Sequence, residues 1–96
     1  MTGKQRAYLR KLAQRQEPIV FVGKEGVTQA LLASVSQALE ARELIKGSVQ
    51  QNSELSARQA CDSICENLQA EGVSVVGRKF VIYKQAEEPK IDLKNI

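Results

Sequence analysis

Two spacings of apolar residues alternate along this chain, and the alternation restricts its fold more than any other feature. Apolar residues recur every three or four positions in residues 4–15, from Thr28 to about Arg42, and from Ser56 to Leu68. Short runs rich in β-branched and aromatic residues lie between and after these stretches, at 19–22, 44–49, 73–76 and 80–83. Such alternation favours helices packed on a sheet, because each strand–helix–strand unit returns the chain to the same sheet.

The predicted order of elements is α-β-α-β-α-β-β, an α/β fold forming a single two-layer domain. The sheet is expected to be mixed and four-stranded, because two right-handed strand–helix–strand crossovers make parallel strands and the last two strands form an antiparallel hairpin. Gly77-Arg78 has the Gly-X order of a type II′ hairpin turn. The chain is long enough for one core but not for two. We therefore expect one domain at residues 1–85 and a polar, loosely ordered tail at 86–96.

Local signals predict where the elements begin and end. The unbroken apolar run at residues 19–22 is typical of a strand covered on both faces. Thr28 is a credible N-cap for the second helix, and Ser56 with Gln59 fits a capping box at the start of the third. Gly72 is the predicted stop of that third helix.

Residue types needed for catalysis are nearly absent. The chain has no histidine, and no serine has an evident basic partner. The acids on the central helices are expected to lie on polar faces and to be solvated: Glu40, Glu43, Asp62 and Glu66. Cys61 and Cys65 are spaced for one helix face and have no histidine to complete a zinc site, so buried apolar thiols are expected. We predict a protein that is not an enzyme and has no cofactor and no metal site.

Positive charge is concentrated at the two ends of the chain. Residues 1–24 carry a net charge of +5, residues 25–72 carry −4, and residues 73–96 carry +2. The polar side of the first helix is almost wholly cationic: Lys4, Lys11 and Arg15 align, with Arg6 and Arg10 towards one flank. If the two ends meet in the fold, the molecule has one positive face.

Residues 23–26 form a G-x-x-G loop, Gly23-Lys24-Glu25-Gly26, between the first strand and the second helix. Two missing side chains allow close approach of a ligand, and the helix start near Thr28 offers unpaired N–H donors, while Lys24 adds a cation. KH-type domains clamp a nucleic-acid backbone in this way. A plain turn is the alternative, and Glu25 would repel phosphate unless it points to solvent.

Further cations near the C-terminal strands, Arg78, Lys79 and Lys84, either extend the cationic face or are simply solvated. The chain has only four aromatic residues, so we expect backbone and shape recognition rather than base stacking. The loop and the basic first helix, separated by one short strand, are expected to form a single anion-binding surface.

Several motifs occur in an order that resembles the CRM domain family (chloroplast RNA splicing and ribosome maturation), in its bacterial stand-alone, YhbY-like form. The motifs are Leu9-Arg10-Lys11-Leu12-Ala13, Pro18-Ile19-Val20, Val22-Gly23-Lys24-Glu25-Gly26-Val27-Thr28, Glu43-Leu44-Ile45-Lys46, Val76-Gly77 and Phe80-Val81-Ile82-Tyr83-Lys84. The resemblance implies a fold like the C-terminal domain of a translation initiation factor. It also implies RNA binding through the loop and basic surface, with ribosomal RNA or precursors of the large ribosomal subunit as partners. The chain departs from the family at Gln14, often histidine, and at Lys84, often arginine.

We therefore expect a monomeric, cytoplasmic RNA-binding protein that acts in ribosome assembly. No signal-peptide pattern and no membrane-spanning stretch are seen, so no membrane partner is expected. The alternative is a protein–protein interaction module whose basic face docks an acidic partner.

Overall fold

Four strands form one mixed sheet in the computed structural model, which describes residues 1–96. The elements in chain order are α1 (Gly3–Ala13), β1 (Val20–Val22), α2 (Gln29–Arg42), β2 (Leu44–Val49), α3 (Ala57–Leu68), β3 (Glu71–Val76) and β4 (Lys79–Tyr83). The predicted order α-β-α-β-α-β-β and the mixed four-stranded sheet are confirmed.

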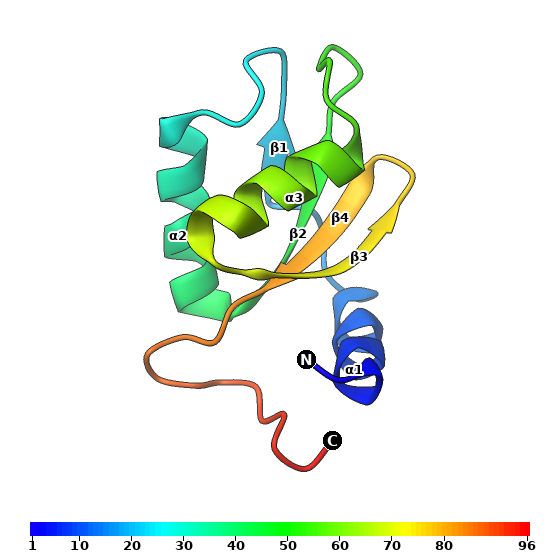
Figure 1. The fold of residues 1–96 in the computed structure, drawn as a ribbon, viewed down its shortest axis with the longest axis vertical. Coiled ribbons are helices and arrows are strands. Elements are labelled where there is room, and N and C mark those ends of the chain that lie inside the picture. The colour runs from blue at the N-terminus through cyan, green and yellow to red at the C-terminus, as the bar shows by residue number, and fades with distance from the viewer.

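The strand order across the sheet is β1-β2-β4-β3. β1 pairs in parallel with β2, and β4 pairs antiparallel with both β2 and β3. β1, β2 and β3 therefore run in the same direction, and the connections that leave their carboxyl ends lie at one end of the sheet (Figure 1). We call this the loop end; it comprises residues 23–28, 50–56 and 77–78. The other end of the sheet carries α1 and the C-terminal tail.

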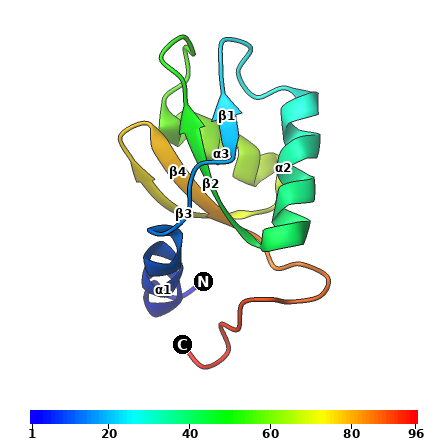
Figure 2. The same cartoon turned by 180° about the vertical axis from the view of Figure 1, so that it is seen from behind.

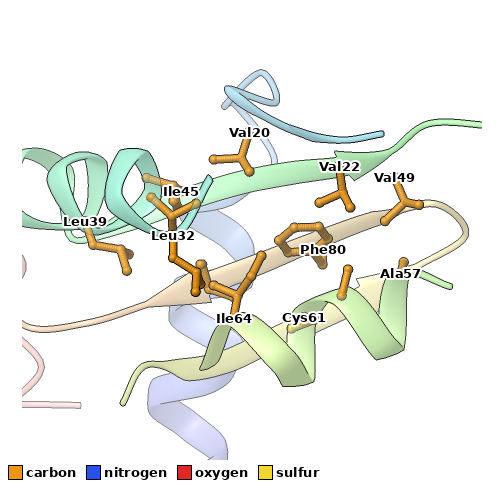
Figure 3. Close-up of a cluster of buried hydrophobic side chains, with 13 residues drawn as sticks. Val20, Val22, Leu32, Leu39, Ile45, Val49, Ala57, Cys61, Ile64 and Phe80 are labelled. Carbon is orange, nitrogen blue, oxygen red and sulfur yellow. The ribbon is translucent and has the colours of Figure 1, made fainter. Parts of the chain in front are cut away.

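The helices divide between the two faces of the sheet. α2 and α3 cover one face, and α1 lies against part of the other (Figures 1 and 2). The first face holds a cluster of 13 buried residues, to which five elements contribute (Figure 3). The second holds six: Leu9, Ala13, Leu44, Val73, Val81 and Tyr83. The main body is thus the expected two layers, and α1 adds partial cover on the opposite side.

Side-chain caps start α2 and α3 where the sequence predicts. The hydroxyl of Thr28 accepts a hydrogen bond from the Leu31 N–H at 3.0 Å. Ser56 and Gln59 form the predicted capping box, in which each side chain accepts from the other residue's N–H. These acceptors satisfy N–H groups that have no partner within the helix, so the two starts are fixed locally.

The predicted stop of α3 at Gly72 is wrong. The helix ends at Leu68, because Gln69 adopts a left-handed conformation with φ of 56° and donates its N–H to the Cys65 carbonyl. Gly72 lies in β3, where a Cβ would sit 3.4 Å from the Cys61 sulfur. That is an ordinary contact distance, so the packing of α3 on the sheet does not require a glycine at this position.

The prediction that the first strand is covered on both faces is also wrong. β1 is an edge strand in which Val20 and Val22 are buried, whereas Phe21 is 53% exposed. Phe21 points to the face that carries α1, and α1 does not reach it. The hairpin prediction fits the backbone: Gly77 has a φ of 59° and Arg78 has no positive φ, as type II′ but not type I′ requires.

Glu43, which the sequence assigned to a solvated helix face, is fully buried between α2 and β2. Its carboxylate accepts hydrogen bonds from the N–H groups of Ala86 at 2.8 Å and of Lys90 and Ile91 at 2.6 Å each. Burial raises the pKa of this carboxyl, but the three N–H donors and the Lys90 charge outweigh that effect and lower the pKa. Glu43 therefore ties the tail to the body as an ionised group.

Candidate nucleic-acid interface

The G-x-x-G loop is a tight turn at the loop end of the sheet. The Gly26 N–H donates to the Gly23 carbonyl at 3.0 Å, and Gly26 has a φ of 73°, which favours glycine. The side chains of Lys24 and Glu25 at its tip are both exposed. The turn therefore holds one cation and one anion in solvent, and Val27 and Thr28 join it to the start of α2.

Backbone donors in this loop are left unused by the protein. The N–H groups of Lys24, Glu25 and Val27 have no acceptor within the chain. The adjacent helix end carries a positive partial charge. Thr28 uses its hydroxyl to cap α2 and so fixes where that helix begins. Unpaired donors, a helix N-terminus and an exposed lysine together can bind an anion such as a phosphate group.

The connection between β2 and α3 packs against the G-x-x-G loop. The Gln50 N–H donates to the Val22 carbonyl at 2.8 Å. A Cβ on Gly23 would lie 2.9 Å from the side-chain oxygen of Gln50. Gly23 thus allows the two connections to approach each other. Sequence reasoning missed the Gln50–Asn52 segment, although its run of polar amides after a strand was a signal for it.

The structure does not bring the basic helix and the loop together. α1 and residues 23–26 lie at opposite ends of the sheet (Figures 1 and 2). The exposed side chains of Lys4 and Lys11 project from the side of α1 opposite to buried Leu9 and Ala13, and exposed Arg15 lies in the turn that follows the helix. The expected single surface is therefore wrong. The reason is β1 itself, because the chain enters it from α1 at one end and leaves it for the loop at the other.

The remaining predicted cations occupy three different places. Arg6 donates a hydrogen bond from its guanidinium to the Gly72 carbonyl and so attaches α1 to β3. Arg78 lies at the loop end, where its carbonyl accepts from the Val49 N–H at 2.8 Å and its side chain is exposed. Lys84 is exposed at the α1 end, where its N–H donates to the Glu43 carbonyl at 3.0 Å.

A groove of about 480 Å³ lies between α1 and the uncovered part of the sheet. Three cations line it, Arg10 from α1, Lys46 from β2 and Lys79 from β4, and none of its lining residues is acidic. Sequence reasoning missed Lys46. The alternation of side chains along β2 was a usable signal, because Lys46 must lie on the opposite face from buried Ile45.

A second hollow of about 570 Å³ lies between the start of α1 and the tail. Its lining mixes the acids Glu71 and Asp92 with the bases Lys90 and Lys94. Of these two hollows, the groove is therefore the one whose charged lining residues are all basic. Separately, none of the three helices is long and apolar enough to cross a membrane.

Comparison with known proteins places this geometry in a family. The model of the CRS1 / YhbY (CRM) domain matches residues 1–84. The chain is 39% identical over 90 residues to "Probable RNA-binding protein YqeI" of Bacillus subtilis, covering 94% of each chain. It is 32% identical over 93 residues to an "RNA-binding protein" of Haemophilus influenzae, covering 97% of this chain and 94% of the other.

A solved structure agrees with the fold. The solution structure of a Staphylococcus aureus protein, described as "a putative RNA binding protein", superposes with a TM-score of 0.79 at 38% identity and covers 94% of each chain. The match covers nearly all of the chain, so the fold is shared at the level of the backbone.

Proposed function

This chain belongs to the CRS1/YhbY (CRM) domain family, and from that we propose that it binds RNA and associates with precursors of the large ribosomal subunit during ribosome assembly. Relatives named as RNA-binding proteins support the first part. The second part is what the resemblance to YhbY-like proteins implies. In this proposal the protein acts as a monomer in the cytoplasm and catalyses no reaction.

One observation carries the proposal: the loop at residues 23–28 combines unpaired backbone donors, a helix start and the exposed Lys24. Gly26 allows the turn through its positive φ and Gly23 leaves room for Gln50, so the two glycines shape the loop that presents these donors. The N–H groups of Lys24, Glu25 and Val27 donate to phosphate oxygens, and the Lys24 ammonium adds a point charge. Glu25, exposed at the same tip, has to point away from the bound strand for this contact to be favourable.

The cationic side of α1 is a second RNA contact in this proposal. The molecule measures 40 × 25 × 21 Å, and the two contacts lie towards opposite ends of its long axis. One RNA that reaches both must follow most of that length. This fits a long, folded RNA such as a ribosomal precursor better than a short isolated segment.

Charge reversal at the loop tests the proposal. Lys24→Glu should weaken binding to RNA of any sequence, because a phosphate contact carries no base information. Lys94→Glu changes the net charge equally at the α1 end and is the matched control. If about six cations meet phosphates, the log–log salt slope should be about −4. Equal affinity of the Lys24→Glu protein and the wild type would remove the loop from the interface.

Sedimentation of cell extracts tests the ribosomal part. The protein should travel with precursors of the large subunit, and Lys24→Glu should shift it towards the top of the gradient. Crosslinking in cells, followed by sequencing of the attached RNA, should return large-subunit precursor sequences. Crosslinks spread evenly over messenger RNA would contradict the ribosomal assignment and leave RNA binding intact.

The rival function is docking of an acidic protein through the same cations. Polyglutamate and RNA of equal charge separate the two. RNA should displace a labelled RNA probe, whereas polyglutamate at the same charge concentration should displace little of it. Preferential displacement by polyglutamate, with a salt slope near zero for RNA, would favour the rival.

A further inference from the structure

We propose that the uncovered half of the sheet beside α1 binds unpaired nucleotides, with Phe21 stacking on a base and Arg10, Lys46 and Lys79 contacting the phosphates. This inference rests on the proposed RNA-binding function and names the kind of RNA and the second site that it uses. It assigns a role to the groove and to an exposed aromatic residue that the G-x-x-G loop does not explain.

The first observation is apolar surface that the fold leaves in solvent. Phe21 is 53% exposed and Val76 is 76% exposed, on the sheet face where α1 packs. Ile19, just before β1, is 37% exposed. Figure 2 shows α1 at the lower end of this face and the connection to β1 crossing the strands above it, with no helix over the rest of the face. Phe21 stands on one edge strand and Val76 on the other, so exposed apolar residues border the open face on both sides, as on an interaction surface.

Strand register places the ring and the cations on one surface. Phe21 lies opposite Ser48, Ser48 opposite Lys79, and Lys79 opposite Val76. Side chains at paired positions share a face, and adjacent strands are about 4.8 Å apart, so Phe21 and Lys79 are separated by about 10 Å. Lys46, two residues before Ser48, points to the same face. The ring and the two lysines are therefore within reach of a few consecutive nucleotides.

Charge on this surface has one sign. Arg10 reaches the groove from α1, opposite Lys46 and Lys79, and no acid lines it. The groove's volume of about 480 Å³ lies within the roughly 300–1,000 Å³ of ligand clefts. The acid-containing hollow on the other side of α1 does not offer such a field. The groove is complementary to a polyanion.

The combination of a ring with cations favours unpaired RNA. Bases in a duplex are stacked on their neighbours and cannot lie on a protein ring, whereas single-stranded bases stack readily on aromatic side chains. An acidic protein would meet the cations but would have no need of the ring. Phe80 and Tyr83 are buried in the two clusters and Tyr8 lies on α1, so Phe21 is the aromatic side chain that the strands of this open face present. The expectation against base stacking, drawn from the small number of aromatics, did not account for where each one lies.

The test compares three labelled probes of about 12 nucleotides, a length within the range bound by small domains. They are a mixed-sequence single strand, a ribose–phosphate strand of the same length without bases, and a duplex. Phe21→Leu keeps apolar surface but removes the ring. It should lower the affinity for the single strand about tenfold. The affinities for the baseless strand and the duplex should stay within about twofold of the wild-type values. Phe21→Trp should restore or tighten single-strand binding.

Lysine variants test the other half of the inference. Lys46→Gln with Lys79→Gln should weaken both strands, with and without bases, and reduce the salt slope by about 1.4. Lys90→Gln with Lys94→Gln removes the same charge at the tail and should leave the slope unchanged. A single strand carrying 4-thiouridine should crosslink to peptides that contain residues 19–22 or 74–81.

The outcomes separate this inference from the proposed function. If Phe21→Leu binds the single strand as the wild type does while Lys24→Glu does not, the sheet site is overturned and loop binding stands. Equal losses for all three probes would also overturn the inference, because stacking would not be the cause. If the wild type binds polyglutamate but no RNA probe, both fail. Urea denaturation of Phe21→Leu should give an unchanged midpoint, which ties any loss to the exposed ring.

Discussion

The two faces of the sheet differ in how completely they are covered. Two helices and 13 buried residues close the first face, whereas one helix and a six-residue cluster close only part of the second. Phe80 and Phe21 show the contrast within one residue type: Phe80 is 1% exposed and Phe21 is 53% exposed. Stability is thus concentrated on one side of the sheet, which leaves the other side available for binding.

Truncation of Phe80 and of Phe21 should give the largest difference in the free energy of unfolding between the two faces. Phe80→Ala should lower the free energy of unfolding by about 3–5 kcal/mol, because it empties the centre of the large cluster. Phe21→Ala should change it by less than about 0.5 kcal/mol, as for other surface positions. Urea denaturation measures both. A cost at Phe21 approaching that at Phe80 would show that the second face also supports the fold.

Leu9→Ala should show how the small cluster holds α1. Leu9 is fully buried against the sheet, and its truncation should cost about 2–3 kcal/mol, at the lower end for leucine because the half-open face can relax. Hydrogen exchange should accelerate in α1 before it does in α2 or α3. Uniform acceleration across all three helices would contradict the separation of the two faces.

Gly47→Ala tests how closely the core is packed on the first face of the sheet. A Cβ on Gly47 would overlap the Phe80 ring, so we expect a loss of about 1–3 kcal/mol. Gly3→Ala is the control, since nothing lies within 4 Å of a Cβ at Gly3. Phe80→Leu should make room for the added methyl group, so the double variant should cost less than the sum of the two single ones.

Glu43→Gln should lower the free energy of unfolding by about 1–2 kcal/mol, the lowest range among the destabilising variants, by weakening the cover of the second face. The Glu43 carboxylate holds the tail, and Ile91 and Leu93 of the tail pack against the small cluster. The folded-state pKa of Glu43 lies below its ordinary value of 4.5. The stabilisation that ionised Glu43 provides is therefore complete above pH 4.5 and is lost as the pH falls below that value.

Stability measured against pH checks the sign of this prediction. The wild type should lose stability on acidification through this window, and Glu43→Gln should lose less. A wild type and variant with parallel pH profiles would show that Glu43 does not titrate with unfolding.

Much of the fold was accessible from the sequence because its signals are local. Thr28 and Ser56 cap their helices through residues three positions away, and Gly77 sets its own turn. Long-range features were not accessible. Glu43 binds backbone groups more than 40 positions away, and no local pattern marks such an acceptor.

Errors about the candidate site have different causes. The exposure of Phe21 depends on β1 lying at the edge of the sheet and on α1 stopping short of it, neither of which an apolar run encodes. The separation of α1 from the loop, by contrast, was predictable. Any helix that precedes a strand and any loop that follows it lie at opposite ends of that strand.

The shared direction of β1, β2 and β3 has an evolutionary consequence. Three connections converge at one end of the sheet, and the residues at their tips, such as Lys24, Gln51 and Arg78, are exposed. Replacement or insertion at those tips costs the body little. A lineage can therefore change the residues displayed at this end while inheriting the same scaffold unchanged.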